Sequence, residues 1–197
     1  MKLVLATQNK GKVREIAAAL VSADIEVLSL DDFPQVGDIE EDGATFLENA
    51  IKKARVTASL TSLLALADDS GLEVDHLQGA PGVYSARFAG PVKSDQANNE
   101  KLLSLLEGVP PEKRTARFQC VMAIAHPDGQ LHTVQGTCAG IIANEPKGDM
   151  GFGYDPLFFL PEYGKTFAQL ELPLKNRISH RGQALALAIA YLKEISV

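Results

Sequence analysis

Short apolar runs alternate with helical patterns over the first 70 residues, and this alternation restricts the possible folds more than any other feature. Apolar runs at residues 2–7, 26–30 and 63–67 have the length of buried strands. Between the first two runs, apolar residues recur at helical spacing from Val13 to Leu20. A Thr45–Glu48 capping box opens a second helix before the third run. Strands that alternate with helices indicate an α/β fold containing parallel strands.

The second half of the chain has a different pattern. Residues 116–125 and 131–142 read as two strands, and Asp128–Gly129 reads as a two-residue hairpin turn between them. Helices are expected at residues 94–107 and 179–195. We therefore predict a mixed sheet, partly parallel and partly antiparallel, that is elongated and flanked by helices.

Length and composition limit what the chain can be. Its 197 residues are 46% hydrophobic and 22% charged, which excludes a disordered chain. The length allows one domain over residues 1–197, as one body or as two lobes around one cleft. No apolar stretch approaches the roughly 18 residues that a membrane-spanning helix needs. The first apolar run is too short for a signal peptide, so we expect a cytoplasmic protein that does not associate with membranes.

The charge balance bears on possible partners. With 19 Lys and Arg against 25 Asp and Glu, the formal net charge is −6. A negative chain argues against non-specific nucleic-acid binding, which needs a basic field, but it permits a small phosphorylated ligand bound by a few focused cations.

In the register of the predicted turn, Cys120 faces Thr137, so Cys138 points to the other face of the sheet. We therefore expect two buried free cysteines and no disulfide.

A polar loop and a pair of adjacent carboxylates follow two of the predicted strands. The loop Thr7–Lys12 leads from a strand into a helix, where backbone N–H groups and two lysines could bind an anion. Asp68 and Asp69 leave the carboxyl end of the third strand, which in α/β sheets is where ligands sit. Adjacent carboxylates repel unless a cation lies near, and Mg²⁺ takes oxygen ligands and bridges to phosphates. A solvated turn is the alternative for each segment.

Four further features carry polar or aromatic groups with possible chemistry. The acidic stretch Glu40–Asp42 could add a carboxylate to the same metal, or be a solvated loop. Lys53 lies on the helix face of Asn49 among small residues, which leaves room for a ligand. Gly151–Pro156 places an aromatic ring between glycines, which suits stacking on a planar ligand. Residues 175–182 crowd cations at the start of a helix, where Ser179 is the expected N-cap and an anionic or carbonyl-bearing partner would be needed.

Six segments in this order resemble the inosine triphosphate pyrophosphatase family, and in particular its bacterial RdgB-type branch. The resemblance covers essentially the whole chain. It is carried by the segments Ala6–Glu15, Thr45–Ala54, Ala67–Leu72, Gly79–Arg87, Gly151–Pro156 and Ser179–Gly182. No segment typical of the family is missing.

The resemblance implies a fold, an assembly and a reaction. Each subunit of a homodimer would have two lobes around a central nucleotide-binding cleft. The reaction would be Mg²⁺-dependent hydrolysis of dITP, ITP and XTP between the α- and β-phosphates, giving a nucleoside monophosphate and pyrophosphate. Such an enzyme would remove non-standard purines from the nucleotide pool and prevent their incorporation into DNA and RNA.

The resemblance also implies roles for individual residues. Asp69 would be the general base and a metal ligand, with Glu40 as the second ligand, Glu41 competing for that place and Asp68 supporting the metal. The remaining residues would bind the substrate, and they are Thr7, Gln8, Asn9, Lys10, Gly11, Lys12, Lys53, Ser70, Phe152, Gly153, Tyr154, Asp155, Lys175, His180 and Arg181. Among these, Phe152 would stack on the base, and Lys175, His180 and Arg181 would read it.

Two other functions fit parts of the pattern. A Maf-like pyrophosphatase acting on dTTP, UTP or modified pyrimidines would use similar phosphate chemistry, but the Phe152–Asp155 and Ser179–Arg181 segments speak against it. A regulator that binds nucleotides without hydrolysing them would gain little from the two carboxylates at Asp68 and Asp69.

Overall fold

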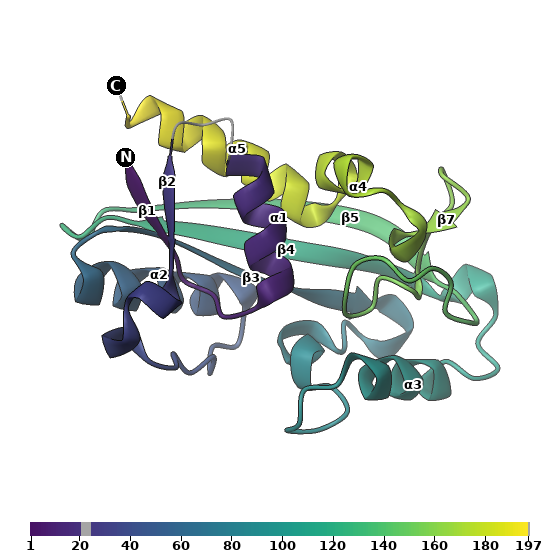
Figure 1. Cartoon of the computed structure of the whole chain (residues 1–197). Helices are drawn as coiled ribbons and strands as arrows, with labels where there is room; N and C mark the ends of the chain where they lie inside the picture. Colours follow the sequence, from purple (N-terminus) through teal and green to yellow (C-terminus); the bar gives the residue numbers. More distant parts are fainter. Residues whose placement is uncertain (21–24, 197) are drawn as a thin grey trace. The chain divides into compact units, whose positions relative to one another are not determined.

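The computed structural model describes residues 1–20 and 25–196, which form five α-helices and seven strands (Figure 1). The described strands make one sheet in the order β2-β1-β3-β4-β5-β6-β7. Their bounds are β1 Lys2–Leu5, β2 Glu26–Ser29, β3 Leu64–Val74, β4 Thr115–Ala125, β5 Leu131–Ile142, β6 Phe158–Leu160 and β7 Lys165–Thr166. The described α-helices are α1 Lys10–Leu20, α2 Phe46–Thr61, α3 Asp95–Leu105, α4 Leu172–Ile178 and α5 His180–Glu194.

The sheet is mixed, as the sequence predicts. Strand β1 pairs in parallel with both β2 and β3. Strand β6 pairs antiparallel with β5 and with β7. The parallel strands are those joined through helices, and the antiparallel ones follow the hairpin. None of the helices in the described residues is long and apolar enough to cross a membrane.

The described chain divides into two compact units, each built from separate segments. Unit 1 consists of residues 1–70, 120–136 and 181–197, and unit 2 of residues 71–119 and 137–180. Strands β3, β4 and β5 and helix α5 each contribute residues to both units.

Helices cover both faces of the unit 1 strands. Leu3 and Leu5 of β1 and Leu66 of β3 join one core cluster with residues of α1, β4 and α5. The alternate residues, such as Val4 and Ala65, are also buried but lie outside that cluster. Since side chains alternate across a strand, these residues belong to the opposite face, where α2 packs (Figure 1).

Unit 2 has its own aromatic core. Phe118 of β4 and Phe158 of β6 lie with ring centroids 4.7 Å apart, and Phe167 stacks on Phe118 at 5.8 Å. Leu72 and Val74 from the second half of β3 join the same cluster.

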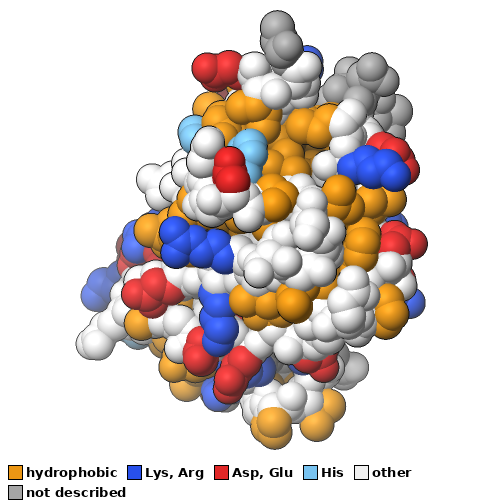
Figure 2. All heavy atoms as spheres, turned by 90° about the vertical axis from the view of Figure 1, so that its left-hand side faces the viewer, with side chains coloured by type: hydrophobic (Ala, Val, Ile, Leu, Met, Phe, Trp, Pro, Cys, Tyr) orange, Lys and Arg blue, Asp and Glu red, His pale blue; other side chains and the backbone are white. Residues whose placement is uncertain are grey.

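On the face seen in Figure 2, acidic and basic side chains are interspersed among hydrophobic ones and do not gather into a basic field.

One predicted strand end is wrong. The sequence places the end of the third strand at Ala67, whereas β3 continues through Asp68 and Asp69 to Val74. The expectation followed the apolar run, which ends where the carboxylates begin, and burying charge in a strand has a cost. That cost is offset here because cationic side chains from other elements pair with both carboxylates.

The predicted hairpin turn is one residue too short. His126 N–H donates to the Gln130 carbonyl, so three residues, Pro127–Gly129, form the loop. Gly129 has a φ of 94°, which suits the left-handed position that ends a three-residue loop.

Both cysteines are free, as expected, although only Cys120 is fully buried and Cys138 is partly exposed.

The predicted capping box of α2 is confirmed and can be tested by substitution. The Thr45 hydroxyl accepts the Glu48 N–H, and the Glu48 carboxylate accepts the Thr45 N–H. Replacing Thr45 with Ala should cost about 1 kcal/mol and lower Tm by roughly 2–4 °C. Thr45→Ser keeps the acceptor and is the matched control. A Thr45→Ala protein that melts like wild type would contradict the importance of this cap.

Candidate active site

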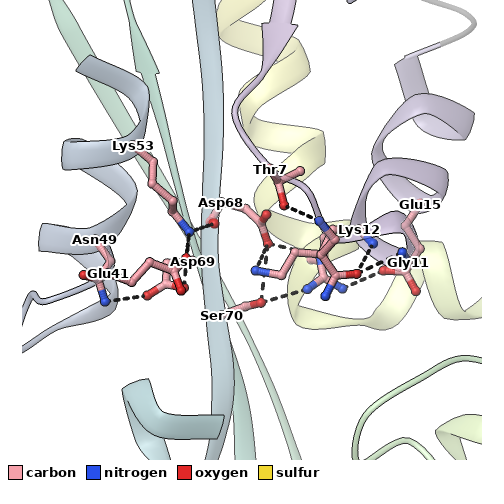
Figure 3. A network of polar contacts seen from close by, with 12 residues as sticks. Thr7, Gly11, Lys12, Glu15, Glu41, Asn49, Lys53, Asp68, Asp69 and Ser70 are labelled. Atoms are coloured by element: carbon pink, nitrogen blue, oxygen red, sulfur yellow. Dashed lines mark hydrogen bonds and ion pairs between the residues drawn. The ribbon is translucent and has the colours of Figure 1, made fainter. Parts of the chain in front are cut away.

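The continuous strand β3 directs its adjacent carboxylates to opposite faces of the sheet. Asp68 is in phase with Leu64 and Leu66, so it lies on the face of α1 and α5, while Asp69 lies on the face of α2. Figure 3 shows the two side chains pointing away from each other, Asp69 toward Asn49 and Lys53. The two carboxylates therefore do not need one shared cation, because each has its own.

Asp68 is held by two cations, the partly buried Lys12 and the buried Arg181. Its Oδ2 lies 3.0 Å from Lys12 Nζ and 3.3 Å from Arg181 Nε. The side chain is fully buried, and burial alone would raise the pKa of the carboxyl group. The positive charges of Lys12, Arg181 and Lys53 outweigh burial and hold the pKa of Asp68 well below its ordinary value. Asp68 is thus a permanent anion.

Arg181 connects three elements of unit 1. Besides Asp68, its guanidinium donates to Glu15 of α1 at 2.6 Å and to the Ser70 hydroxyl of β3 at 2.8 Å. Arg181 is 4% exposed, so these charge-assisted hydrogen bonds are shielded from water. Ser70 and Arg181, both predicted to bind the substrate, therefore contact each other.

The loop Thr7–Lys12 is organised by Asn9. Asn9 Oδ1 accepts the backbone N–H groups of Gly11 and Lys12, and the Asn9 N–H donates to Thr7. Two N–H groups that the sequence offers to an anion are thus capped by a side chain. The Lys12 ammonium pairs with Asp68 of β3, while Gln8 and Lys10 are exposed.

Asp69 is held by two residues from one face of α2. Asn49 Nδ2 donates to Asp69 Oδ2 at 3.1 Å, and Lys53 Nζ lies 3.5 Å from Asp69 Oδ1. Burial raises the pKa of Asp69, and the charges of Lys53 and Lys12 only partly oppose that effect. Burial opposes the charge of Lys53, but the nearby carboxylates outweigh it and raise the pKa of the Lys53 ammonium. Asp69 is therefore the more basic member of the Asp68–Asp69 pair.

The acidic stretch contributes Glu41 rather than Glu40 to these contacts. Glu41 Oε1 lies 2.5 Å from Lys53 Nζ, and Glu40 is exposed. Among the described residues, no group of three or more carboxylate, histidine or cysteine side chains is arranged to hold a metal ion by itself. Oxygen donors on Asp69 and one glutamate suit Mg²⁺, which binds through one or two carboxylates and completes its shell with water and phosphate.

The glycine-rich loop of unit 2 is fixed by Asp155. Asp155 Oδ2 accepts the Phe152 N–H at 3.0 Å and lies 2.6 Å from Lys175 Nζ. A Cβ at Gly151 would come within 2.0 Å of the same oxygen, so this loop requires glycine there. Lys175 Nζ also lies 5.2 Å from the centre of the Phe152 ring. The Phe152 ring is partly exposed, whereas Asp155 and Lys175 are buried.

Neighbouring side chains hold Gly153 and Tyr154. Gly153 donates its N–H to Asp95 at 2.7 Å and accepts from Asn99 at 2.9 Å. The Tyr154 hydroxyl donates to the Ser85 carbonyl at 2.9 Å, and its ring packs into the core of unit 2.

The cations at residues 175–181 are arranged differently from the prediction. Lys175 lies in the last turn of α4, a helix the sequence does not reveal, and Ser179 follows that helix in extended conformation. A cation in the last turn of a helix interacts favourably with the helix dipole, so the position of Lys175 does not by itself require an anionic partner. His180 opens α5, and its ring stacks on Phe118 with centroids 4.6 Å apart.

Sequence reasoning assigned no role to several residues that hold these side chains. Asn49 and Glu15 both lie in segments that carry the resemblance, and Asn49 was placed on the face of Lys53. The sequence signal for both residues is a polar side chain on the largely apolar face of a helix. Asp95, Asn99 and Phe118 gave no signal, because their partners are far away in the sequence.

Comparison with known proteins identifies the family. Residues 3–191 match the Ham1 family, and the chain belongs to it. It is 61% identical over 197 residues to a dITP/XTP pyrophosphatase of Desulforamulus reducens, covering all of this chain and 98% of that protein. It is 59% identical over 186 residues to a dITP/XTP pyrophosphatase of Geobacter sulfurreducens, covering 94% of each.

A solved structure supports the fold. The structure of a HAM1 protein from Coxiella burnetii matches with a TM-score of 0.90 and 44% identity, over 98% of this chain and 99% of that one. The mixed α/β fold and the family resemblance drawn from the sequence are both confirmed.

The buried charges around Asp68 lead to a stability prediction. Asp68→Asn leaves Lys12 and Arg181 beside a neutral amide, so we expect the free energy of unfolding to fall by about 3–5 kcal/mol near neutral pH. Asp75→Asn is the control, since Asp75 is an exposed partner of Arg117 and surface ion pairs contribute about 0–1 kcal/mol. Denaturant titrations of the three proteins measure the difference.

The same measurement has an expected pH dependence. The folded-state pKa of Asp68 lies below the ordinary value of 3.8, so its stabilising contribution is present above that pH and is lost as the pH falls below it. The stability gap between wild type and Asp68→Asn should therefore narrow below about pH 4. A gap that stays constant, or widens, would show that the charge of Asp68 is not its source.

Proposed function

We propose that this chain hydrolyses dITP, ITP and XTP to the nucleoside monophosphate and pyrophosphate. The observation that carries the proposal is the buried Asp69 carboxylate, oriented by Asn49 and Lys53 on β3, in a chain 61% identical to a curated dITP/XTP pyrophosphatase. A nucleotide regulator without activity would not need a basic carboxylate beside a buried lysine.

Unit 1 supplies the groups that phosphoanhydride hydrolysis needs. The reaction depends on positioning and charge neutralisation more than on covalent chemistry. Lys12, Lys53 and the loop Thr7–Lys12 would bind the triphosphate, and Ser70 would contact it. Asp69 would accept the proton of the attacking water, because burial raises its pKa while Asn49 keeps one oxygen in a fixed direction.

A divalent metal ion, for which we propose Mg²⁺, would supply charge neutralisation at the scissile phosphates when bound. Asp69 and Glu40 are the proposed ligands. Glu41 is the alternative to Glu40, since it already lies beside Lys53.

Unit 2 supplies groups suited to a planar base. Phe152 would stack on the purine, and Gly153, Tyr154 and Asp155 would shape its surroundings. Lys175 and His180 would read the base, as would Arg181, which belongs to unit 1 and whose guanidinium already contacts Glu15, Asp68 and Ser70. Donors facing the 6-carbonyl of hypoxanthine or xanthine would face the amino group of adenine, and an unpaired buried donor costs about 1–3 kcal/mol.

The location, assembly and partners of the enzyme are also proposed. We propose a cytoplasmic homodimer that acts on free nucleotides and does not bind nucleic acid. The interspersed charges on the face in Figure 2 support the last point.

A release assay tests the function. The purified protein is incubated with Mg²⁺ and, separately, ITP, XTP, ATP, GTP and dTTP, and pyrophosphate and orthophosphate are quantified. We expect pyrophosphate from ITP and XTP and little from the other three. Orthophosphate would contradict the proposed bond cleavage, turnover of dTTP alone would favour a Maf-like enzyme, and tight ITP binding without turnover would favour a regulator.

Substitution of Asp69 tests the proposed base. Asp69→Asn should lower kcat by about 10²–10⁴-fold, the usual contribution of a positioned general base. Asp128→Asn, an exposed carboxylate in the β4–β5 turn, is the matched control and should leave kcat near wild type. Near-normal turnover by a folded Asp69→Asn protein would remove Asp69 from the proposed role.

A further inference from the structure

Asn49 makes two hydrogen bonds that join separate parts of the proposed active site. It lies on α2 and is 1% exposed. Its Nδ2 donates to Asp69 Oδ2 at 3.1 Å, and its Oδ1 accepts the Gly43 N–H at 2.8 Å. The Gly43 N–H needs an oxygen, so the amide nitrogen must face Asp69, which is an acceptor. Figure 3 shows Asn49 and Lys53 pointing from α2 toward Asp69.

Asn49 shares the buried face of α2 with apolar residues and with Lys53. Its neighbours on the buried face of α2 include Phe46, Ala50 and Ala54. A buried amide is costly unless its hydrogen bonds are made, and no helix-packing requirement compensates for that cost. Both polar groups of Asn49 instead find partners, one in the acidic stretch and one on β3.

The Asn49 amide fixes the plane of the Asp69 carboxylate. Asp69 Oδ1 faces Lys53 at 3.5 Å, and Oδ2 receives the Asn49 amide. Two donors on different oxygens resist rotation of the carboxylate. With only the ammonium of Lys53 left, both oxygens could turn toward it.

Asn49 also holds the acidic stretch near Asp69. Gly43 directly follows Glu40–Asp42, and a Cβ on Gly43 would lie 2.7 Å from Asn49 Oδ1 and 2.8 Å from Glu48 Cβ. The chain therefore approaches α2 closely at the residue that Asn49 binds. Asn49 thus links Asp69 to the segment that carries Glu40 and Glu41, alongside Lys53, which contacts both Glu41 and Asp69.

We propose that Asn49 is a positioning residue that orients Asp69 and holds the Glu40–Gly43 segment beside it, so that base and metal ligands are assembled before substrate binds. This inference rests on the proposed function and adds to it a residue that acts through Asp69. The Asn49 side chain would contribute to kcat and to metal binding, and little to nucleotide binding.

Three variants separate this role from a structural one. Asn49→Asp keeps an acceptor for Gly43 but loses the donor to Asp69, and Asn49→Ala loses both. Asn98→Asp is the matched control: Asn98 is a buried helical asparagine of unit 2 that accepts from Ala89 and donates to backbone carbonyls. Thermal unfolding, kcat and KM for ITP, Mg²⁺ binding to substrate-free protein by calorimetry and hydrogen exchange of residues 40–44 are measured.

We expect kcat to fall by about 10–100-fold in both Asn49 variants, and Mg²⁺ affinity to fall by a similar factor in Asn49→Ala, the usual effect of losing a partner behind a metal ligand. KM for ITP should change little. Hydrogen exchange in residues 40–44 should accelerate in Asn49→Ala and less in Asn49→Asp. Asn98→Asp should lower Tm without weakening Mg²⁺ binding.

Two results would overturn the inference. One is wild-type Mg²⁺ affinity in Asn49→Ala, and the other is a loss of kcat in the Asn49 variants no greater than Asn98→Asp shows at a similar loss of Tm. Failure of the proposed function is seen separately, as absence of pyrophosphate release by the wild type. In that case Mg²⁺ binding and hydrogen exchange still decide whether Asn49 assembles the site.

Discussion

The alternation of side chains along β3 is the constraint on which the site depends. Consecutive residues of a strand face opposite sides of a sheet, so Asp68 and Asp69 enter different environments although they are chemically identical. Asp68 meets Lys12 and Arg181, and Asp69 meets Asn49 and Lys53. Ending the strand at Ala67 would have left both carboxylates in one solvated turn without this division.

The two environments have opposite effects on the carboxylates. Paired cations lower the pKa of Asp68 and make it a fixed charge that ties α1 and α5 to β3 through Lys12 and Arg181. Burial dominates at Asp69 and raises its pKa. Removing one partner of Asp68 would leave an uncompensated buried charge, which costs several kcal/mol. Asp69 instead remains a carboxylate able to accept a proton.

Local patterns predicted the elements, and long-range pairing explains the errors. The α2 cap was predictable because Thr45 and Glu48 are three residues apart. The continuation of β3 was not, since Arg181 lies 113 residues from Asp68. Helix α4 is short and contains a proline, and no apolar periodicity marks it. The site segments were found by resemblance, but their contacts were not. Unit boundaries could not be read because each unit joins distant segments.

The ion-pair distances distinguish the buried aspartates, among the described residues, that pair with a lysine. Asp68 lies 3.0 Å from Lys12 and Asp155 lies 2.6 Å from Lys175, whereas Asp69 is 3.5 Å from Lys53. Lys53 in turn is shared with Glu41 and with the Asp68 carbonyl. A carboxylate in direct contact with its own cation is neutralised and serves to hold structure, as Asp155 holds the Phe152 loop. Asp69 has the longest ion pair of the three and a neutral amide as its direct donor, and it therefore keeps the basicity that chemistry requires.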